Sequence, residues 1–135
     1  MRILGIDYGD SRIGIAVSDL MGMTAQPISV ISEKERAKQL QAVAEYIKEY
    51  KVEKIVMGMP KNMNGSIGER AEKTRQFGIE LAEFSGLPVI EWDERLSSAY
   101  AHRTLTEGNV SGKKRKGLVD KLAAAFILQG YLDAN

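Results

Sequence analysis

The run at residues 3–9 constrains this chain most, because a short apolar strand ends there in a carboxylate and a glycine. After Gly9 and a polar turn at residues 10–12, the chain returns as a second apolar run at residues 13–17. This pattern predicts an antiparallel hairpin. Burying the Asp7 carboxylate is costly unless a metal ion or strong hydrogen-bond donors accompany it. The structural alternative is a strand-end aspartate that shapes the turn.

Two glycines, Gly5 and Gly14, interrupt the apolar runs of this hairpin. A glycine inside a strand leaves room for another backbone, a helix or a ligand to approach closely. We therefore expect some other part of the protein or a ligand to pack closely against the hairpin.

The remaining sequence alternates between strand-like and helix-like segments. Strands are predicted over residues 24–31, 52–57 and 89–92, and helices over residues 33–50, 69–84, 96–106 and 118–132. Ser32 and Glu35 have the spacing of a capping box at the start of the first helix. This order predicts one α/β domain over residues 1–135, with a mixed five-stranded sheet flanked by helices. Its first three strands are antiparallel and its continuation is parallel.

Composition excludes several classes of site. The 135 residues include no cysteine and one histidine, His102, which excludes disulfides and thiolate metal sites and argues against a histidine-based metal cage or a Ser-His-Asp triad. No apolar stretch approaches the roughly 18 residues of a membrane span, so we expect a cytoplasmic protein without membrane contact. With 19 basic and 18 acidic residues the net charge is +1, so the distribution of charge is more informative than its sum.

Carboxylates stand at the ends of three predicted elements. Asp7 ends the first strand, Asp93 and Glu94 follow the strand at residues 89–92, and Asp120 falls in the first turn of the last predicted helix. Separated acids of this kind can hold two divalent cations about 4 Å apart, which clamp both sides of a phosphoryl displacement. The alternatives are a carboxylate that complements the helix dipole for Asp120, and a helix cap with an ion pair to Arg95 for the middle acids.

Motifs along nearly the whole chain resemble the YqgF/RuvX family of RNase H-like nucleases. They are GIDYG at residues 5–9, RIG at 12–14, GMP at 58–60, NGS at 64–66, DERLS at 93–97 and VDKLAA at 119–124, in the family's order. The resemblance implies an RNase H-like fold and cleavage of nucleic-acid phosphodiester bonds that depends on Mg²⁺ or Mn²⁺, with two ions. It also implies that Asp7, Glu94 and Asp120 are the catalytic acids and metal ligands, with Asp93 as the competitor for the middle position.

A basic run precedes the last predicted helix and suits a phosphate-rich substrate. Lys113, Lys114, Arg115 and Lys116 lie between two glycines, which predicts a basic loop beside the acids that holds a nucleic-acid backbone. The alternative is a solvated run of charges. Further candidate substrate contacts are Asn62, Asn64, Arg12 and Arg95.

The family resemblance leaves the substrate open. The family is assigned to maturation of the 5′ end of pre-16S rRNA and was earlier proposed to resolve Holliday junctions. A resolvase needs two sites related by a two-fold axis, and no self-complementary apolar patch is evident in the sequence. We therefore expect a monomer or weak homodimer that prefers RNA to DNA junctions. Two alternatives remain. The opening hairpin is also typical of a small actin-like ATP-binding protein, and the fold also suits a non-catalytic RNA-binding module.

Overall fold

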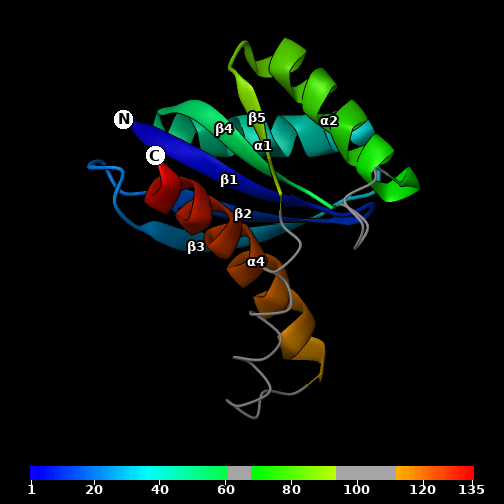
Figure 1. Cartoon of the computed structure of the whole chain (residues 1–135). Helices are drawn as coiled ribbons and strands as arrows, with labels where there is room; N and C mark the ends of the chain where they lie inside the picture. The colour runs from blue at the N-terminus through cyan, green and yellow to red at the C-terminus, as the bar shows by residue number, and fades with distance from the viewer. Residues whose placement is uncertain (61–67, 94–111) are drawn as a thin grey trace.

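A mixed five-stranded sheet forms the centre of the molecule (Figure 1). The computed structural model describes residues 1–60, 68–93 and 112–135, with the backbone alone described at 112–119. The elements are β1 (Arg2–Tyr8), β2 (Arg12–Ser18), β3 (Ala25–Ser32), α1 (Arg36–Tyr50), β4 (Val52–Met59), α2 (Glu69–Ser85), β5 (Val89–Asp93) and α4 (Gly112–Ala134). The strand order is β3-β2-β1-β4-β5. β2 pairs antiparallel with β1 and β3, whereas β4 pairs parallel with β1 and β5, which confirms the predicted sheet.

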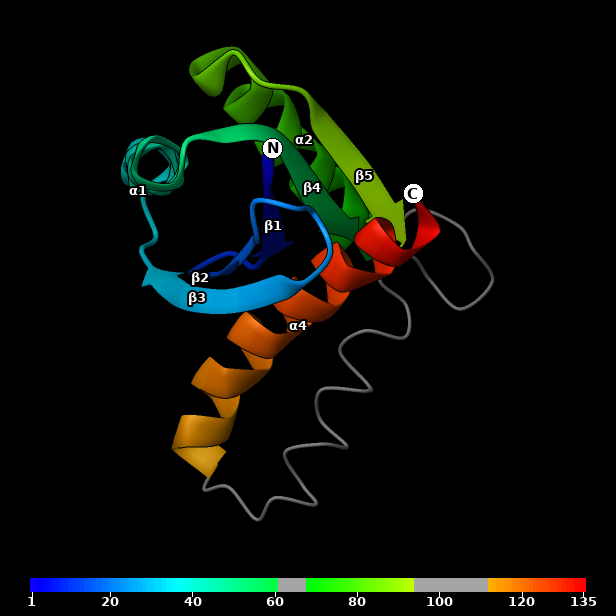
Figure 2. The ribbon, with the colours of Figure 1, turned by 90° about the vertical axis from the view of Figure 1, so that its left-hand side faces the viewer.

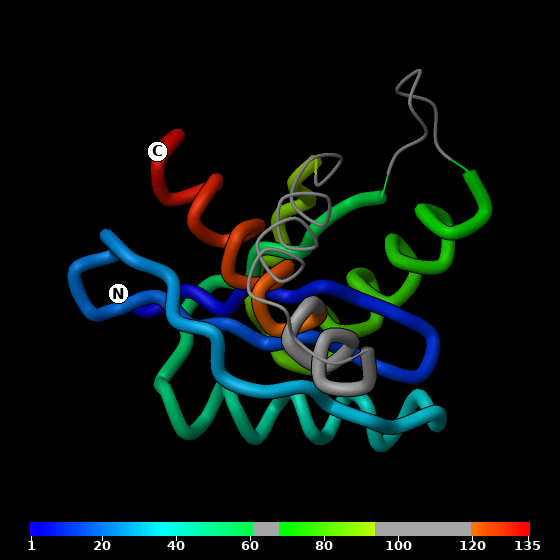
Figure 3. The backbone as a smooth tube through the Cα atoms, turned by 90° about the horizontal axis from the view of Figure 1, so that it is seen from below, coloured from blue at the N-terminus to red at the C-terminus, as the bar shows by residue number. Residues whose placement is uncertain are grey.

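Helices cover both faces of this sheet, with α1 and α2 on one side and α4 on the other (Figures 2 and 3). Side chains alternate along each strand, so successive residues enter different cores. In β1, Leu4 and Ile6 pack in the core beneath α1 and α2, whereas Ile3 packs with Ala124 and Leu128 of α4. The face of a β1 residue thus decides which helix it meets, and the odd-numbered residues of β1 meet α4.

The hairpin glycines allow α4 to lie directly on the strands. A Cβ atom at Gly5 would stand 2.7 Å from Cβ of Leu128 and 2.9 Å from the carbonyl oxygen of Ala124. A Cβ atom at Gly14 would overlap the carbonyl oxygen of Asp120. The close approach expected at both glycines is therefore confirmed, and the element that approaches is the last helix.

The capping box predicted for the first helix is wrong. Ser32 is the last residue of β3, and α1 begins only at Arg36, with Glu35 as an N-cap that makes no side-chain capping hydrogen bond. The side chain of Glu33 instead accepts hydrogen bonds from the amides of Lys34 (3.0 Å) and Glu35 (3.3 Å). Glu33 thus organises the connection locally, and the helix starts one turn later than the spacing predicts.

The basic segment is helical, so the predicted basic loop is also wrong. α4 begins at Gly112, and residues 113–116 form its first turns. Lysine and arginine are good helix formers, and one glycine inside a long helix costs only about 1 kcal/mol, so Gly117 does not mark its start. The helix predicted over residues 96–106 lies outside the described residues. None of the helices that the structure describes is long and apolar enough to cross a membrane.

The packing of α4 on the hairpin gives a stability test. We predict that Gly14→Ala lowers the free energy of unfolding by about 1–3 kcal/mol, because the new methyl group forces α4 off β2. Urea unfolding followed by circular dichroism measures the loss. Gly130→Ala is the control within the same helix: its Cβ would stand 3.2 Å from Nε1 of Trp92, and the gain in helix propensity offsets the contact. Equal losses in the two variants would contradict this account of the packing.

Candidate active site

Asp7 and Asp120 come together where α4 crosses the hairpin. Asp7 pairs with Gly14 across the β1–β2 ladder, so both residues present the same face of the sheet. Gly14 is also the residue whose missing side chain makes room for the backbone of Asp120. Asp7 is buried, with 9% of its surface exposed, and the Asp120 side chain is 18% exposed. Asp7 and the backbone of Asp120, from opposite ends of the chain, thus both adjoin Gly14 at the end of β1.

Asp120 does not lie in a first helical turn, which excludes the simple dipole explanation for its position. It is the ninth residue of α4, and the first turn of that helix contains no acidic residue. The helix dipole favours carboxylates only within about the first turn. The position of Asp120 is set instead by the contact of α4 with Gly14.

Arg12 supplies a cation to Asp120. This residue begins β2, and its Nε atom lies 2.9 Å from Oδ2 of Asp120. The Arg12 side chain is 38% exposed, and the Oδ2 atom that it meets is buried. The sequence predicts Arg12 as a substrate contact, and in this structure its guanidinium pairs with Asp120. The sequence contains no pattern that pairs residue 12 with residue 120.

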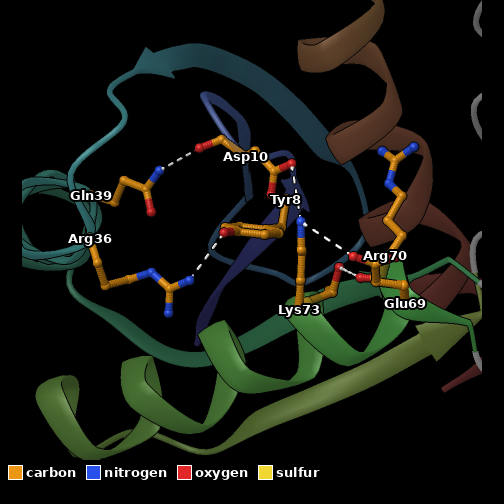
Figure 4. Close-up of polar contacts among 8 residues, drawn as sticks. Tyr8, Asp10, Arg36, Gln39, Glu69, Arg70 and Lys73 are labelled. Carbon is orange, nitrogen blue, oxygen red and sulfur yellow. Dashed lines mark hydrogen bonds and ion pairs between the residues drawn. The ribbon is translucent and has the colours of Figure 1, made fainter.

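The turn between Asp7 and Arg12 is tied to α1 by a buried glutamine (Figure 4). Gln39 is 1% exposed, and its Nε2 atom donates to the carbonyl oxygens of Asp10 (3.0 Å) and Glu33 (2.7 Å). On the outer side, Nζ of Lys73 lies 3.9 Å from Oδ2 of Asp10. Sequence reasoning missed Gln39, and the available signal was a glutamine directly beside the apolar stripe of its helix.

Tyr8, which follows Asp7, is a structural ring. It is buried on the opposite face of the sheet, where its ring stacks on Phe77 at a centroid distance of 4.6 Å. Nη2 of Arg36 donates to the Tyr8 hydroxyl at 3.2 Å (Figure 4). These contacts anchor the end of β1 and so help to hold Asp7 in place.

The two residues before Asp93 show how side chains are directed along β5. Glu91 points to α2, where it accepts a hydrogen bond at 3.0 Å from Nε of Arg75. Trp92 points to α4, where its ring meets Tyr131 edge-on at a centroid distance of 5.6 Å. Because side chains alternate along a strand, Asp93 shares the α2 face with Glu91.

Asp7 and Asp93 therefore belong to different faces of the sheet. Asp93 is exposed, and the alternation of side chains along β5 places it on the opposite face of the sheet from Asp7. This argues against Asp93 as the middle acid. Glu94, the other candidate, lies outside the described residues.

The remaining predicted contacts are not described at the level of side chains. Asn62, Asn64 and Arg95 lie outside the described residues. Lys113, Lys114, Arg115 and Lys116 belong to the described backbone of α4. Of this group, the structure therefore relates only the basic segment to the acids, through the helix that it shares with Asp120.

The donors at this place suit a hard divalent cation. Asp7 and Asp120 offer carboxylate oxygens, the ligands that Mg²⁺ and Mn²⁺ prefer. The Arg12 guanidinium already pairs with the Asp120 carboxylate, so the site accommodates a positive charge. Within residues 1–60, 68–93 and 112–135, no group of three acidic or histidine side chains is close enough to hold a metal ion. The described pair therefore needs at least one more ligand, from water, substrate or another acid.

Solved structures define the class of fold. The structure superposes on Thermus thermophilus RuvC in complex with a Holliday junction substrate with a TM-score of 0.63 and 17% identity, covering 99% of this chain and 94% of that one. It superposes on the fowlpox virus resolvase in complex with Holliday junction DNA with a TM-score of 0.56 and 14% identity, covering 99% and 98%. The chain thus has the RNase H-like fold of these proteins, as predicted.

Sequence comparison then identifies the family. A family model described as "RuvX: Holliday junction resolvase" matches residues 1–134. Relatives named "Putative pre-16S rRNA nuclease" include one from Halothermothrix orenii, 56% identical over 98% of this chain and 95% of its own length. Another, from Listeria monocytogenes, is 51% identical over 100% and 99%. This chain belongs to the RuvX (YqgF) family.

The direction of Asp93 gives a test of the middle position. We predict that Asp93→Asn changes Mn²⁺ affinity by no more than about twofold, as for a surface substitution. Glu94→Gln should weaken Mn²⁺ binding by about tenfold or more, because it would remove a ligand or its immediate support. Isothermal titration of each purified variant with Mn²⁺ makes the comparison. Loss of binding in the Asp93 variant alone would reverse the assignment.

Proposed function

We propose that this chain is a metal-dependent nuclease that hydrolyses phosphodiester bonds, and that it acts in processing the 5′ end of pre-16S rRNA in the cytoplasm. The observation that carries the proposal is the meeting of Asp7 and Asp120 at the end of β1, where α4 crosses Gly14. Membership of the RuvX family and the names of relatives at 50–56% identity support nuclease activity and the RNA substrate.

Asp7, Glu94 and Asp120 are the proposed ligands of one or two Mg²⁺ or Mn²⁺ ions. When bound, such ions neutralise charge on the scissile phosphate and lower the pKa of an attacking water. The protein contributes the placement of the carboxylates: the strand β1 holds Asp7, and α4 holds Asp120. Preorganised groups of this kind lose little freedom when the substrate arrives, which favours the reaction.

The basic segment of α4 is the proposed contact with the nucleic-acid backbone. Residues 113–116 precede Asp120 by four to seven positions on one helix, which is about 6 to 10 Å along its axis. Cations at that distance can hold phosphates next to the scissile one without taking part in the chemistry. Asn62, Asn64 and Arg95 are proposed as further contacts, and Arg12 as a contact at the acids themselves.

Resolution of Holliday junctions is the second candidate, favoured by the description of the family model. Two copies of the protein would then have to present their sites to opposed strands. In the described part of the chain, the large exposed apolar side chains fall into the β2–β3 turn with Met1 and into α2. They are Met1, Leu20, Met21, Met23, Ile79 and Phe84. Neither group borders Asp7, so we propose a monomer or weak homodimer.

An ATP-binding role and a non-catalytic RNA-binding role are less consistent with these findings. The family model covers residues 1–134 and describes a resolvase, not a kinase or an ATPase. A module that only binds RNA has no need for two carboxylates at one place, because they repel a phosphate backbone unless cations intervene.

Substitution of Asp7 tests the proposed chemistry. We predict that Asp7→Asn lowers the cleavage rate by about a hundredfold or more, since a metal ligand supplies several kcal/mol of transition-state stabilisation. The metal-free variant should melt at the wild-type temperature or slightly above it, because one of two neighbouring acids has been neutralised.

The effect of Mn²⁺ on the melting temperature provides a second test of Asp7→Asn and allows a control variant. Mn²⁺ should raise the melting temperature of the wild type more than that of Asp7→Asn, because the ion binds only the folded site. Asp19→Asn, in the exposed β2–β3 turn, should respond to Mn²⁺ like the wild type. Wild-type turnover in the Asp7 variant would contradict the proposed role of the acids.

A comparison of substrates tests the biological assignment. We predict that the protein cleaves single-stranded RNA or RNA ends of a 16S precursor, with little or no cleavage of four-way DNA junctions. Sedimentation at micromolar concentration should show a monomer or a weak dimer. A tight dimer that cuts junctions symmetrically and spares RNA would favour the second candidate.

A further inference from the structure

We propose that Arg12 is a resident counter-ion of the site, which holds Asp120 while no divalent cation is bound and which a divalent cation must displace. The inference rests on the proposed function, because it takes Asp120 to be a metal ligand. It concerns a step before catalysis, namely how the site is kept assembled and how it is loaded.

The first support is the geometry of the ion pair. Nε of Arg12 lies 2.9 Å from Oδ2 of Asp120, which is contact distance between a guanidinium and a carboxylate. A Mg²⁺ ion bound to this oxygen would stand about 2.0–2.1 Å from it. The oxygen is buried, so a guanidinium at contact distance restricts the approach of a second cation from that side.

The second support is the restricted position of Asp120. Its backbone lies against Gly14 so closely that a methyl group would not fit between them. The backbone of Asp120 therefore cannot move far from the hairpin that carries the buried Asp7, which limits how far the two acids can separate. A cation must compensate this charge, and among the described side chains Arg12 is the one seen to do so at Asp120.

The third support is that Arg12 is able to leave. Its side chain is 38% exposed and belongs to the residue that begins β2, next to the turn. The guanidinium regains water when it leaves, so its release costs less than that of a fully buried cation. A divalent cation would bring more charge to the same oxygen, with Asp7 as a proposed second ligand. Competition between the two cations is the expected consequence.

Metal titration without substrate tests the proposal. We expect Arg12→Gln to bind Mn²⁺ more tightly than the wild type, by about threefold to tenfold, because the competing charge is gone. The metal-free Arg12→Gln protein should melt below the metal-free wild type, and the melting temperatures should converge when Mn²⁺ is saturating. Arg12→Lys, which keeps the charge, should restore an affinity close to that of the wild type.

Arg75→Gln is the matched control. Nε of Arg75 lies 3.0 Å from Oε2 of Glu91, and the Arg75 side chain is 36% exposed, so this pair resembles that of Arg12 in length and exposure. It joins α2 to β5 on the opposite face of the sheet from Asp7. Its loss should leave Mn²⁺ affinity unchanged.

The possible results separate this inference from the proposed function. If the wild type binds Mn²⁺ but Arg12→Gln binds it equally or more weakly, the counter-ion role is wrong and the metal site stands. If Arg75→Gln binds Mn²⁺ as tightly as Arg12→Gln, the effect is one of general charge and the role is also wrong. If the wild type binds no Mn²⁺, both the inference and the proposed metal site fail.

Discussion

The contact between α4 and the β1–β2 hairpin is the constraint on which the site depends. Without side chains at Gly5 and Gly14, the helix backbone lies directly on the strands. That contact sets the position of the Asp120 backbone and brings the first and last parts of the chain together. The absence of side chains at these two positions thus determines how near Asp7 and Asp120 come to one another.

This packing also determines the electrostatics of the site. Bringing two carboxylates to one partly enclosed place disfavours their ionised forms unless a cation is near. The sheet cannot relieve the repulsion, because Asp7 is held by the buried ladder of β1 and Tyr8 is fixed beneath it by Phe77 and Arg36. A fold that assembles such a site in advance therefore needs positive charge in the absence of metal, and Arg12 lies where that need arises.

Much of the fold follows from the sequence, because local patterns report local structure. The hairpin, the mixed sheet and the close approach at Gly5 and Gly14 were all predictable from apolar runs and missing side chains. Local patterns were misleading where a longer-range contact decided the outcome. The spacing of Ser32 and Glu35 fits a capping box, but pairing with β2 extends β3 through Ser32. Gly117 suggested a helix start, but α4 continues through it.

The sequence predicts which residues belong to the site, but it does not predict the contacts among them. Motifs identified Asp7 and Asp120 as candidate acids, yet their meeting, the ion pair of Arg12 and the buried Gln39 depend on how distant segments pack. The acids alone do not determine which substrate the protein cleaves. Phosphodiester hydrolysis at two carboxylates is the same chemistry for RNA and for DNA junctions, and one fold supports many functions. Discrimination must therefore come from what surrounds the acids: the cations of α4, and whether one site or two opposed sites meet the substrate.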